Sequence, residues 1–253
     1  VLNELNVYPV PDGDTGSNMS MTISAVEKEL TKVNEKSSMN EVSEAVEEAI
    51  LMGARGNSGT ILSQIITGFL KGIGDKDRLY AADVVIALES AKEVAYQAVN
   101  QPVEGTILTV IRKVADSARE YVKTSDDLVG LLENIKDTAQ EAVEQTPEEL
   151  PKLKEAGVVD AGAKGLFYIL EGFYMLITQA DLVEEIESTE VKNADFSATI
   201  ANIDHDPDSI TFQYCTEFII GNASFDTDKF KEEILELGDS AVFAQSSKKF
   251  KVH

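Results

Sequence analysis

Apolar residues recur every three or four positions along most of the chain up to residue 178. This spacing places them on one face of a helix. The first segment shows it at Met19, Ile23, Val26 and Leu30. Seven such segments are predicted to be helices, over residues 17–33, 38–50, 60–71, 82–99, 106–122, 128–143 and 164–177.

The region of these helices is expected to be all-helical, because no alternating β-branched run of strand length competes with them. Ser38 and Glu41 form a capping-box pattern that opens the second helix. Helices with one apolar face bury that face by packing on each other. Residues 1–180 are therefore expected to form a mainly α domain, an antiparallel bundle of about eight helices. Its glycine-rich turns could together form one composite site at an end of the bundle.

The pattern changes after residue 180. Residues 181–196 are acidic and weakly patterned, and we interpret them as a linker. In the remainder, strand-forming and turn-forming residues alternate around one helical segment that has Asp226 as its N-cap. Residues 197–253 are expected to form part of a small α+β domain, with strands over 197–203, 210–220 and 241–253 and a helix over 226–237.

Composition narrows the classes of protein and partner. The 253 residues are enough for one large domain or two smaller ones, and 43% of them are hydrophobic. A net charge of −23 repels nucleic acid and anionic membranes, and no segment is long and apolar enough for stable membrane insertion. An acidic surface also repels ATP, so an ATP site here needs metal ions and directed N–H groups.

The number of cysteines indicates whether the cellular compartment is oxidising or reducing. The single cysteine, Cys215, excludes an internal disulfide framework. No signal-peptide pattern follows Val1, and both observations favour a reducing, cytoplasmic location. Because the sequence starts at a valine, we expect it to be a fragment of a longer protein.

The strongest chemical signal lies between residues 6 and 18, where two carboxylates stand one residue apart. An EF-hand needs glycine at the sixth loop position and glutamate at the twelfth, but Ser17 and Ile23 occupy those positions. A turn that only caps the following helix explains one acidic residue but not both. The functional interpretation is that the carboxylates bind Mg²⁺ while small side chains and helix N–H groups face phosphate oxygens. The predicted metal ligands are Asp12 and Asp14, and the predicted phosphate contacts are Thr15, Gly16, Ser17 and Asn18.

Further segments carry weaker signals. Residues 53–60 join two predicted helices through the sequence Gly-Ala-Arg-Gly-Asn-Ser-Gly-Thr. This segment is either a flexible turn capped by a serine or a second phosphate clamp, in which glycines permit close backbone approach. Asp160 precedes the last predicted helix, where a simple N-cap is the competing interpretation. The candidate residues are Arg55, Asn57, Ser58 and Gly59, with Thr106, Leu108 and Asp160 further along the chain.

Histidine and cysteine are absent from residues 1–204. A catalytic imidazole or thiolate within the bundle is therefore excluded. Phosphoryl transfer tolerates this, because metal ions and positioning carry most of its catalysis. Arg55 and Lys164 are the cations nearest to these segments, and either could stabilise transition-state charge, although ordinary surface roles explain them equally well.

Taken in order, these segments resemble the signatures of the dihydroxyacetone kinase L-subunit domain. The long Asn-Val-Tyr-Pro-Val-Pro-Asp form and the appended α+β region are most similar to the ATP-binding subunits of the bacterial fatty acid kinase family. The resemblance covers nearly the whole chain. The residues that carry it are Leu5-Asn6, Asp12 to Asn18, Gly56 to Gly59, Gly105 to Leu108 and Asp160 to Ala163.

The resemblance implies a barrel-like bundle that binds ATP or ADP at one end, with two Mg²⁺ ions between carboxylates and phosphates. Asp12 and Asp14 would be the metal ligands. Asn6 is the nearest counterpart of a third aspartate in the dihydroxyacetone enzymes, and its amide oxygen could also ligate Mg²⁺. Near the nucleotide would lie Ser17, Asn18, Asn57, Ser58, Thr106, Leu108 and Asp160.

A zinc site is also implied by the resemblance, formed by a strand cysteine and a His-x-His segment of the middle domain. Cys215 and His253 match the cysteine and the first histidine. Two ligands leave a tetrahedral zinc site incomplete. The competing interpretation of Cys215 is a buried structural thiol in a strand.

The expected activity is transfer of the γ-phosphate of ATP to a fatty acid carboxylate, which gives an acyl phosphate. A carboxylate is already ionised at neutral pH and needs no general base. The resemblance implies that a separate fatty-acid-binding protein presents the acyl chain, and it leaves a homodimer open. The alternatives are a kinase for dihydroxyacetone or a similar small compound, and a nucleotide-dependent binding module without catalysis.

Overall fold

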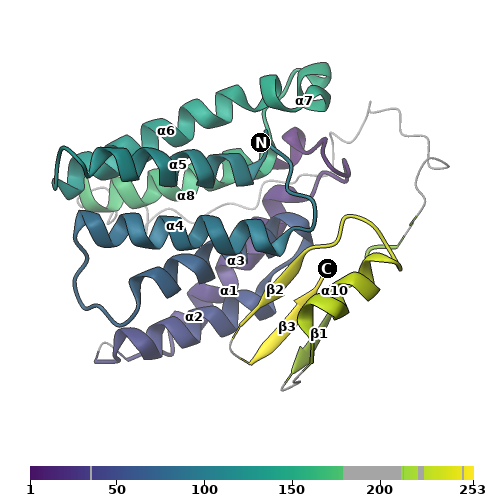
Figure 1. Cartoon of the computed structure of the whole chain (residues 1–253), viewed down its shortest axis with the longest axis horizontal. Helices are drawn as coiled ribbons and strands as arrows, with labels where there is room; N and C mark the ends of the chain where they lie inside the picture. The colour runs from purple at the N-terminus through teal and green to yellow at the C-terminus, as the bar shows by residue number, and fades with distance from the viewer. Residues whose placement is uncertain (35, 179–211, 213, 222–224, 247) are drawn as a thin grey trace.

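The computed structural model describes residues 1–34, 36–178, 212, 214–221, 225–246 and 248–253. This part of the chain is mainly helical and ends in a small antiparallel sheet with one helix, as predicted (Figure 1). A short 3-10 helix, η1 (Leu2–Leu5), precedes the bundle. The bundle helices are α1 (Thr15–Leu30), α2 (Met39–Gly53), α3 (Gly56–Ile73), α4 (Ala81–Ala98), α5 (Ile107–Tyr121), α6 (Leu128–Glu149), α7 (Pro151–Ala156) and α8 (Ala161–Thr178).

The core of the bundle is formed by the apolar faces that the sequence pattern predicted. Leu62, Val110 and Leu131 come from three different helices and are fully buried. α3 and α4 pack especially closely, because a Cβ on Gly68 would lie 2.7 Å from the Cα of Ala91. Such a backbone approach explains why a glycine stands in the middle of a helix.

Helix ends follow the predicted capping chemistry. The hydroxyl of Ser38 accepts a hydrogen bond from the N–H of Glu41, whose carboxylate accepts one from the N–H of Ser38. The capping box is therefore confirmed. Asp226 caps the helix of the α+β unit by accepting hydrogen bonds from two backbone N–H groups, as expected.

The α+β unit contains β1 (Phe218–Gly221), α10 (Thr227–Leu235), β2 (Phe243–Gln245) and β3 (Lys249–Val252). The strand order is β1-β3-β2, and both outer strands are antiparallel to β3. In register, Val252 lies opposite both Phe218 and Phe243. Aromatic rings fill the space between sheet and helix, with Phe250 in edge contact with Phe225 and Phe230.

Three predictions about boundaries are wrong. The single strand expected over 241–253 is a hairpin, because the hydroxyl of Ser246 accepts hydrogen bonds from the N–H groups of Lys248 and Lys249 and so closes a turn. The helix predicted over 128–143 continues to Glu149, and α7 follows it. The strand predicted over 210–220 is realised only in β1, since the described residues 214–217 lie outside any strand. The predicted linker 181–196, the strand 197–203 and His205 lie outside the described residues.

The α+β unit packs against the bundle beside α3 (Figure 1). The N–H of Gln245 donates to the side-chain oxygen of Gln64 over 3.2 Å. Val242 forms an isolated antiparallel bridge with Val99, which follows α4. The C-terminal strands therefore lie beside the middle of α3 and the end of α4. Within the described ranges, no helix combines the length and apolar character that crossing a membrane requires.

Candidate functional site

Two carboxylates lie at the start of α1, close enough for their charges to interact. Burial and then the charge of Asp14 raise the pKa of Asp12 above its ordinary value. A hydrogen bond of 2.7 Å from the amide of Asn6 to Asp12 Oδ1 acts in the opposite direction. Asp14 is the N-cap residue of α1, yet its carboxylate makes no capping hydrogen bond. The pair concentrates negative charge that a bound cation would offset.

Asn6 holds Asp12, the first of these carboxylates, in place. Its amide nitrogen donates to Asp12 and, over 2.9 Å, to the carbonyl of Val10, while its oxygen accepts a hydrogen bond from the hydroxyl of Thr15. Both Asn6 and Thr15 are buried. The amide oxygen that the resemblance assigns to Mg²⁺ is therefore already engaged in this structure. Asn6 here orients Asp12 and Thr15.

The segment η1 closes over the first turn of α1 through Asn3. The side-chain oxygen of Asn3 accepts the N–H of Ser17 over 3.1 Å, and its nitrogen donates to the hydroxyl of Ser17 over 2.9 Å. A Cβ on Gly16 would lie 2.9 Å from the same Asn3 oxygen. Two predicted phosphate contacts, Gly16 and Ser17, thus face a residue that the sequence analysis missed. Its only signal was an amide side chain close to the motif.

One face of α1 links the two motifs. Asp14, Asn18 and Thr22 follow one another at four-residue spacing, which aligns them on a helix. The hydroxyl of Thr22 donates to the carbonyl of Asn18 over 2.6 Å and accepts the N–H of Arg55 over 3.3 Å. The segment after α2 is therefore attached to the helix that carries the carboxylates. Thr22 was missed, although its spacing from Asn18 could have indicated it.

The second glycine segment is shorter than predicted. α2 ends at Gly53 and α3 begins at Gly56, so only Ala54 and Arg55 lie between the helices. Gly56 has a φ of 59°, which favours glycine. A Cβ on Gly56 would clash with the amide of Asn18. The predicted turn is thus a tight corner that is packed against α1.

Asn57 carries an unpaired polar atom in the first turn of α3. Its Oδ1 is buried and has no hydrogen-bond partner among the described residues. A buried oxygen without a donor costs on the order of 1–3 kcal/mol. The first turn of a helix also offers N–H groups and a positive dipole end to an anion, and Ser58 and Gly59 lie in the same turn. The corner therefore has the composition of a ligand-binding surface.

Asp160 joins the starts of two helices. Its carboxylate accepts the N–H of Ala163 over 2.7 Å, which makes it a cap of α8. Burial raises its pKa to about 6, and backbone N–H groups that include that of Ile107 oppose this rise. Burial and the charge of Asp160 raise the pKa of Tyr8, which belongs to the first motif. The competing N-cap interpretation is therefore realised, and contact with a nucleotide stays a prediction.

Of the remaining predicted residues, Thr106 caps α5 and Leu108 lies in the core. The hydroxyl of Thr106 accepts the N–H of Leu108 over 3.3 Å and donates to the carbonyl of Val103 over 2.7 Å. Leu108 is 2% exposed and belongs to the bundle core. A place for either residue beside a nucleotide stays a prediction.

Arg55 turns its guanidinium toward backbone carbonyls. Its Nη1 donates to the carbonyl of Met52 over 3.1 Å and to that of Ala54 over 2.8 Å, and it lies 3.5 Å from the carboxylate of Glu217. These contacts fix the end of α2. A catalytic role of Arg55 stays a prediction.

Cys215 and His253 come together as the resemblance implies, with Sγ and Nε2 separated by 3.5 Å. Cys215 is exposed and lies outside any strand, so the expectation of a buried strand thiol is wrong. The physical reason is the register, in which β1 begins at Phe218 opposite Val252. No group of three or more histidine, cysteine or acidic side chains that could hold a metal occurs in the described ranges. The two donors alone do not fit a tetrahedral zinc ion.

The same pair lies within electrostatic reach of the first motif. Although Cys215 is exposed as a residue, partial burial of its thiol raises the pKa, and the charges of Asp12 and Asp14 add to this. Burial lowers the pKa of His253, while the charge of Glu217 and, to a smaller extent, that of Asp14 raise it. The bundle itself contains no thiol or imidazole, but the α+β unit brings one of each toward the carboxylates. The sequence analysis did not predict this proximity, because Cys215 and His253 lie far from Asp12 and Asp14 along the chain.

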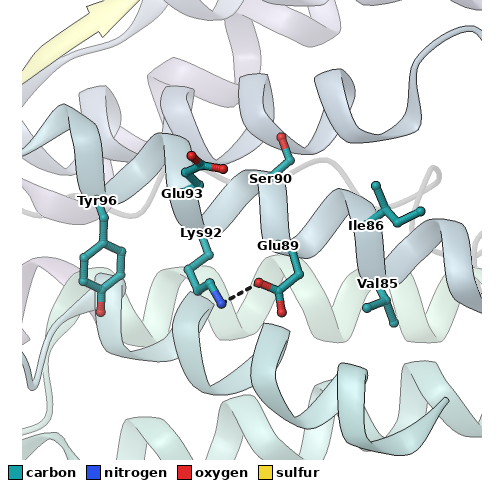
Figure 2. Close-up of a pocket in the computed structure, with 7 residues that line it drawn as sticks. All are labelled: Val85, Ile86, Glu89, Ser90, Lys92, Glu93 and Tyr96. Carbon is teal, nitrogen blue, oxygen red and sulfur yellow. Dashed lines mark ion pairs between the residues drawn. The ribbon is translucent and has the colours of Figure 1, made fainter. Parts of the chain in front are cut away.

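A separate pocket of about 650 Å³ lies along α4 (Figure 2). Figure 2 shows Glu89 and Lys92 on its surface in an ion pair of 2.5 Å. Lys92 also pairs with Asp116 of α5 over 3.2 Å. None of the predicted site residues lines this pocket.

Residues 9–175 match the DAK2 domain family. The chain belongs to this family. Residues 211–253 match a second family, the FakA-like middle domain of fatty acid kinase. A DAK2 domain followed by this middle domain is the arrangement of a FakA-like fatty acid kinase protein.

Curated relatives align with the whole chain. An uncharacterized protein of Staphylococcus epidermidis (strain ATCC 12228 / FDA PCI 1200) is 38% identical over 263 aligned positions. Uncharacterized proteins of Staphylococcus aureus (strain USA300) and Staphylococcus saprophyticus are 37% and 36% identical. Each alignment covers 100% of this chain and 46–47% of the relative. The chain thus spans about half the length of these relatives.

Membership of the DAK2 family suggests that this domain binds a nucleotide and Mg²⁺. The chain's own residues fit that suggestion in two respects. Asp12 and Asp14 bring together two carboxylates, the oxygen ligands that Mg²⁺ uses. Asn57, whose buried Oδ1 has no partner among the described residues, follows Gly56 at the corner that is attached to the same helix.

Proposed function

We propose that this chain is the ATP-binding part of a kinase that phosphorylates a fatty acid carboxylate. One observation carries the proposal: the hydrogen bond from Arg55 to Thr22 attaches the corner at Gly56 to the helix that begins at Asp14. This contact supports a single site in which the carboxylates before α1 would bind metal and the N–H groups at the start of α3 would bind phosphate. The family matches supply the acceptor class, since the second matched region is described as the middle domain of FakA-like fatty acid kinase proteins.

The chain's own residues would bind and orient the nucleotide. Asp12 and Asp14 would hold Mg²⁺, which supplies charge neutralisation for the phosphates when it is bound. Asn6 keeps Asp12 in a fixed orientation through its 2.7 Å hydrogen bond. Asn57 and Ser58, in the first turn of α3, would donate backbone N–H groups and amide contacts to phosphate oxygens.

The transfer itself needs no proton acceptor from the protein. A carboxylate oxygen attacks the γ-phosphorus of ATP, a new oxygen–phosphorus bond forms, and the bond to the β–γ bridging oxygen breaks. ADP leaves with that oxygen. Because the acyl carboxylate is ionised at neutral pH, the bundle can perform this reaction without a histidine or cysteine of its own.

The acyl chain would be presented by a separate fatty-acid-binding protein. This partner is proposed from the family membership. Since the chain spans about half of its relatives, the complete activity belongs to the longer protein in the proposal. In this proposal, the present chain supplies Mg²⁺ binding through Asp12 and Asp14 and phosphate binding through Asn57 and Ser58.

Trapping with hydroxylamine separates the candidate reactions, because it converts an acyl phosphate into a hydroxamate and leaves a phosphate ester intact. With ATP, Mg²⁺ and a fatty-acid-loaded binding protein, we expect hydroxamate to form at the rate at which ADP appears. ADP formation with dihydroxyacetone and no hydroxamate would instead support a small-molecule kinase. Tight binding of ATP without any turnover, with the full-length relative active in the same assay, would support a binding module.

A further inference from the structure

Lys251 reaches from β3 to the end of α2. Its side chain is fully buried, and its Nζ donates a hydrogen bond of 2.6 Å to the carbonyl of Ala54. Ala54 is also fully buried and is the residue that follows α2, directly before Arg55 and Gly56. A buried ammonium group is costly unless it is paired. The hydrogen bond from Lys251 to this carbonyl therefore indicates a structural or functional contribution that offsets the cost of burial.

Two cations share the carbonyl of Ala54. Besides Lys251, the guanidinium of Arg55 donates to it over 2.8 Å. Glu217 bridges the two cations, at 3.3 Å from Lys251 Nζ and 3.5 Å from Arg55 Nη1. The carboxyl end of α2 attracts positive charge because the helix dipole is negative there. The four groups together fix the two residues that connect α2 to α3.

We propose that Lys251 is a positioning residue for the nucleotide site in the bundle. By fixing the carbonyl of Ala54 it sets the path of the chain through Arg55 and Gly56, and so the placement of Asn57. The inference rests on the proposed function, which assigns this corner to phosphate binding. It makes the α+β unit a part of the nucleotide site.

Other contacts also hold the α+β unit against the bundle. Gln245 donates to Gln64, and Val242 bridges to Val99. Lys249 lies two positions before Lys251 on the same strand and also reaches α2. Its Nζ pairs with Glu48 and contacts the sulfur of Met52, so it does not touch the residues after the helix. Lys249 is therefore a matched control for Lys251.

Three variants test the proposal in the chain as it stands: Lys251→Met, Lys251→Arg and Lys249→Met. The first measurement is amide hydrogen exchange of residues 54–59 without nucleotide. Lys251→Met is expected to speed this exchange by about tenfold, the effect of losing one charge-assisted hydrogen bond. Lys251→Arg keeps a charged hydrogen-bond donor and should therefore retain most of the wild-type protection. Lys249→Met should leave the exchange of 54–59 at the wild-type rate.

The second measurement is the dissociation constant of ADP in the presence of Mg²⁺, by calorimetry. Lys251→Met is expected to weaken binding by about tenfold, because the corner must be ordered again before it can bind. Lys249→Met is expected to stay within about twofold of the wild type. Circular dichroism and thermal unfolding verify that each variant is folded. If Lys251→Met does not fold, Glu217→Gln removes the partner carboxylate instead and should shift both measurements in the same direction.

Two results would overturn the proposal. One is unchanged exchange of residues 54–59 in folded Lys251→Met. The other is an equal loss of protection and affinity in Lys249→Met, which would mean that docking in general supports the corner. If the wild-type chain bound no ADP with Mg²⁺, the proposed function would fail, while hydrogen exchange would still decide whether Lys251 positions the corner.

Discussion

The backbone N–H of Arg55 donates a hydrogen bond of 3.3 Å to the hydroxyl of Thr22, across 33 positions of sequence. This contact attaches the α2–α3 corner to the helix whose first residues follow Asp12 and Asp14. It joins two segments of one candidate site. Nothing in the sequence pattern of either segment predicts that they meet. Thr22 is fully buried, so nothing else replaces its hydroxyl when it is removed.

Thr22→Val should therefore destabilise the protein and loosen the corner. Valine has nearly the same shape but removes the acceptor of the part-buried N–H of Arg55, and the loss of such a hydrogen bond costs about 1 kcal/mol. Chemical denaturation followed by circular dichroism measures the loss. Thr22→Ser keeps the hydroxyl and should lose much less. Equal stabilities of the valine and serine variants would show that the hydrogen bond contributes nothing.

Gly56→Ala should disturb the corner through both strain and a clash. The positive φ of Gly56 is strained for alanine, and the new Cβ would meet the amide of Asn18. Gly157→Ala is the control, because Gly157 also has a positive φ but no atom lies within 4 Å of its added Cβ. The control should cost about 1–2 kcal/mol from strain alone.

The clash should add about 1–3 kcal/mol to the cost at Gly56. The difference between the two alanine variants, from denaturant unfolding of each, isolates the contact with Asn18. A difference near zero would mean that Asn18 moves aside without cost.

Asp14→Asn should separate metal binding from folding. Without metal, the variant should melt at a slightly higher temperature than the wild type, because it removes the repulsion that contributes to the raised pKa of Asp12. With Mg²⁺ and ADP, the wild type should gain thermal stability and the variant should gain little. The measurement is the melting temperature with and without Mg²⁺–ADP. A full ligand-induced shift in the variant would remove Asp14 from the metal site.

Asp160 should make the stability depend on pH. Its folded pKa of about 6 is above the unfolded value near 3.8, so the folded state binds more protons in that interval. Stability is then lost as the pH rises from about 4 to 6, by about 3 kcal/mol in total. Asp160→Asn should lack this loss while its amide oxygen still accepts the N–H of Ala163. The measurement is the free energy of unfolding of both proteins at about pH 4.5 to 7.5.

The sign of that difference decides the prediction. Relative to Asp160→Asn, the wild type should become less stable with increasing pH. Tyr8 does not contribute to this difference, because burial and the charge of Asp160 raise its pKa further above its ordinary value, far beyond this pH range. Parallel pH curves for wild type and Asp160→Asn would mean that Asp160 keeps an ordinary pKa.

The predicted helices were largely correct because each carries its own apolar stripe and its own caps. Ser38 with Glu41, and Asp226 at α10, needed only neighbours within three residues. α7 was missed because six residues give too short a pattern. The hairpin of β2 and β3 was missed because the turn depends on the hydroxyl of one serine among several polar residues.

The candidate site divides in a similar way. The sequence indicated Asp12 and Asp14, because two carboxylates in a glycine-rich turn are a local pattern. The resemblance, rather than a local pattern, assigned Asn6 to the metal, and this assignment stays a prediction; the structure shows that its side-chain oxygen accepts a hydrogen bond from Thr15. Asn3 and Glu217 carried no pattern that distinguishes them from surface residues. Their roles arise only from contacts made after folding.

By itself, the sequence determined the helical class, the α+β region that follows it and the carboxylate motif at the start of α1. Each follows from residues close together in the chain, where spacing and capping suffice. Only the tertiary structure decided that Thr22 holds the corner at Gly56, and that Lys251 reaches the end of α2 from a strand about 200 positions away. Such contacts depend on how whole elements pack, because burial of their apolar faces decides which polar groups meet.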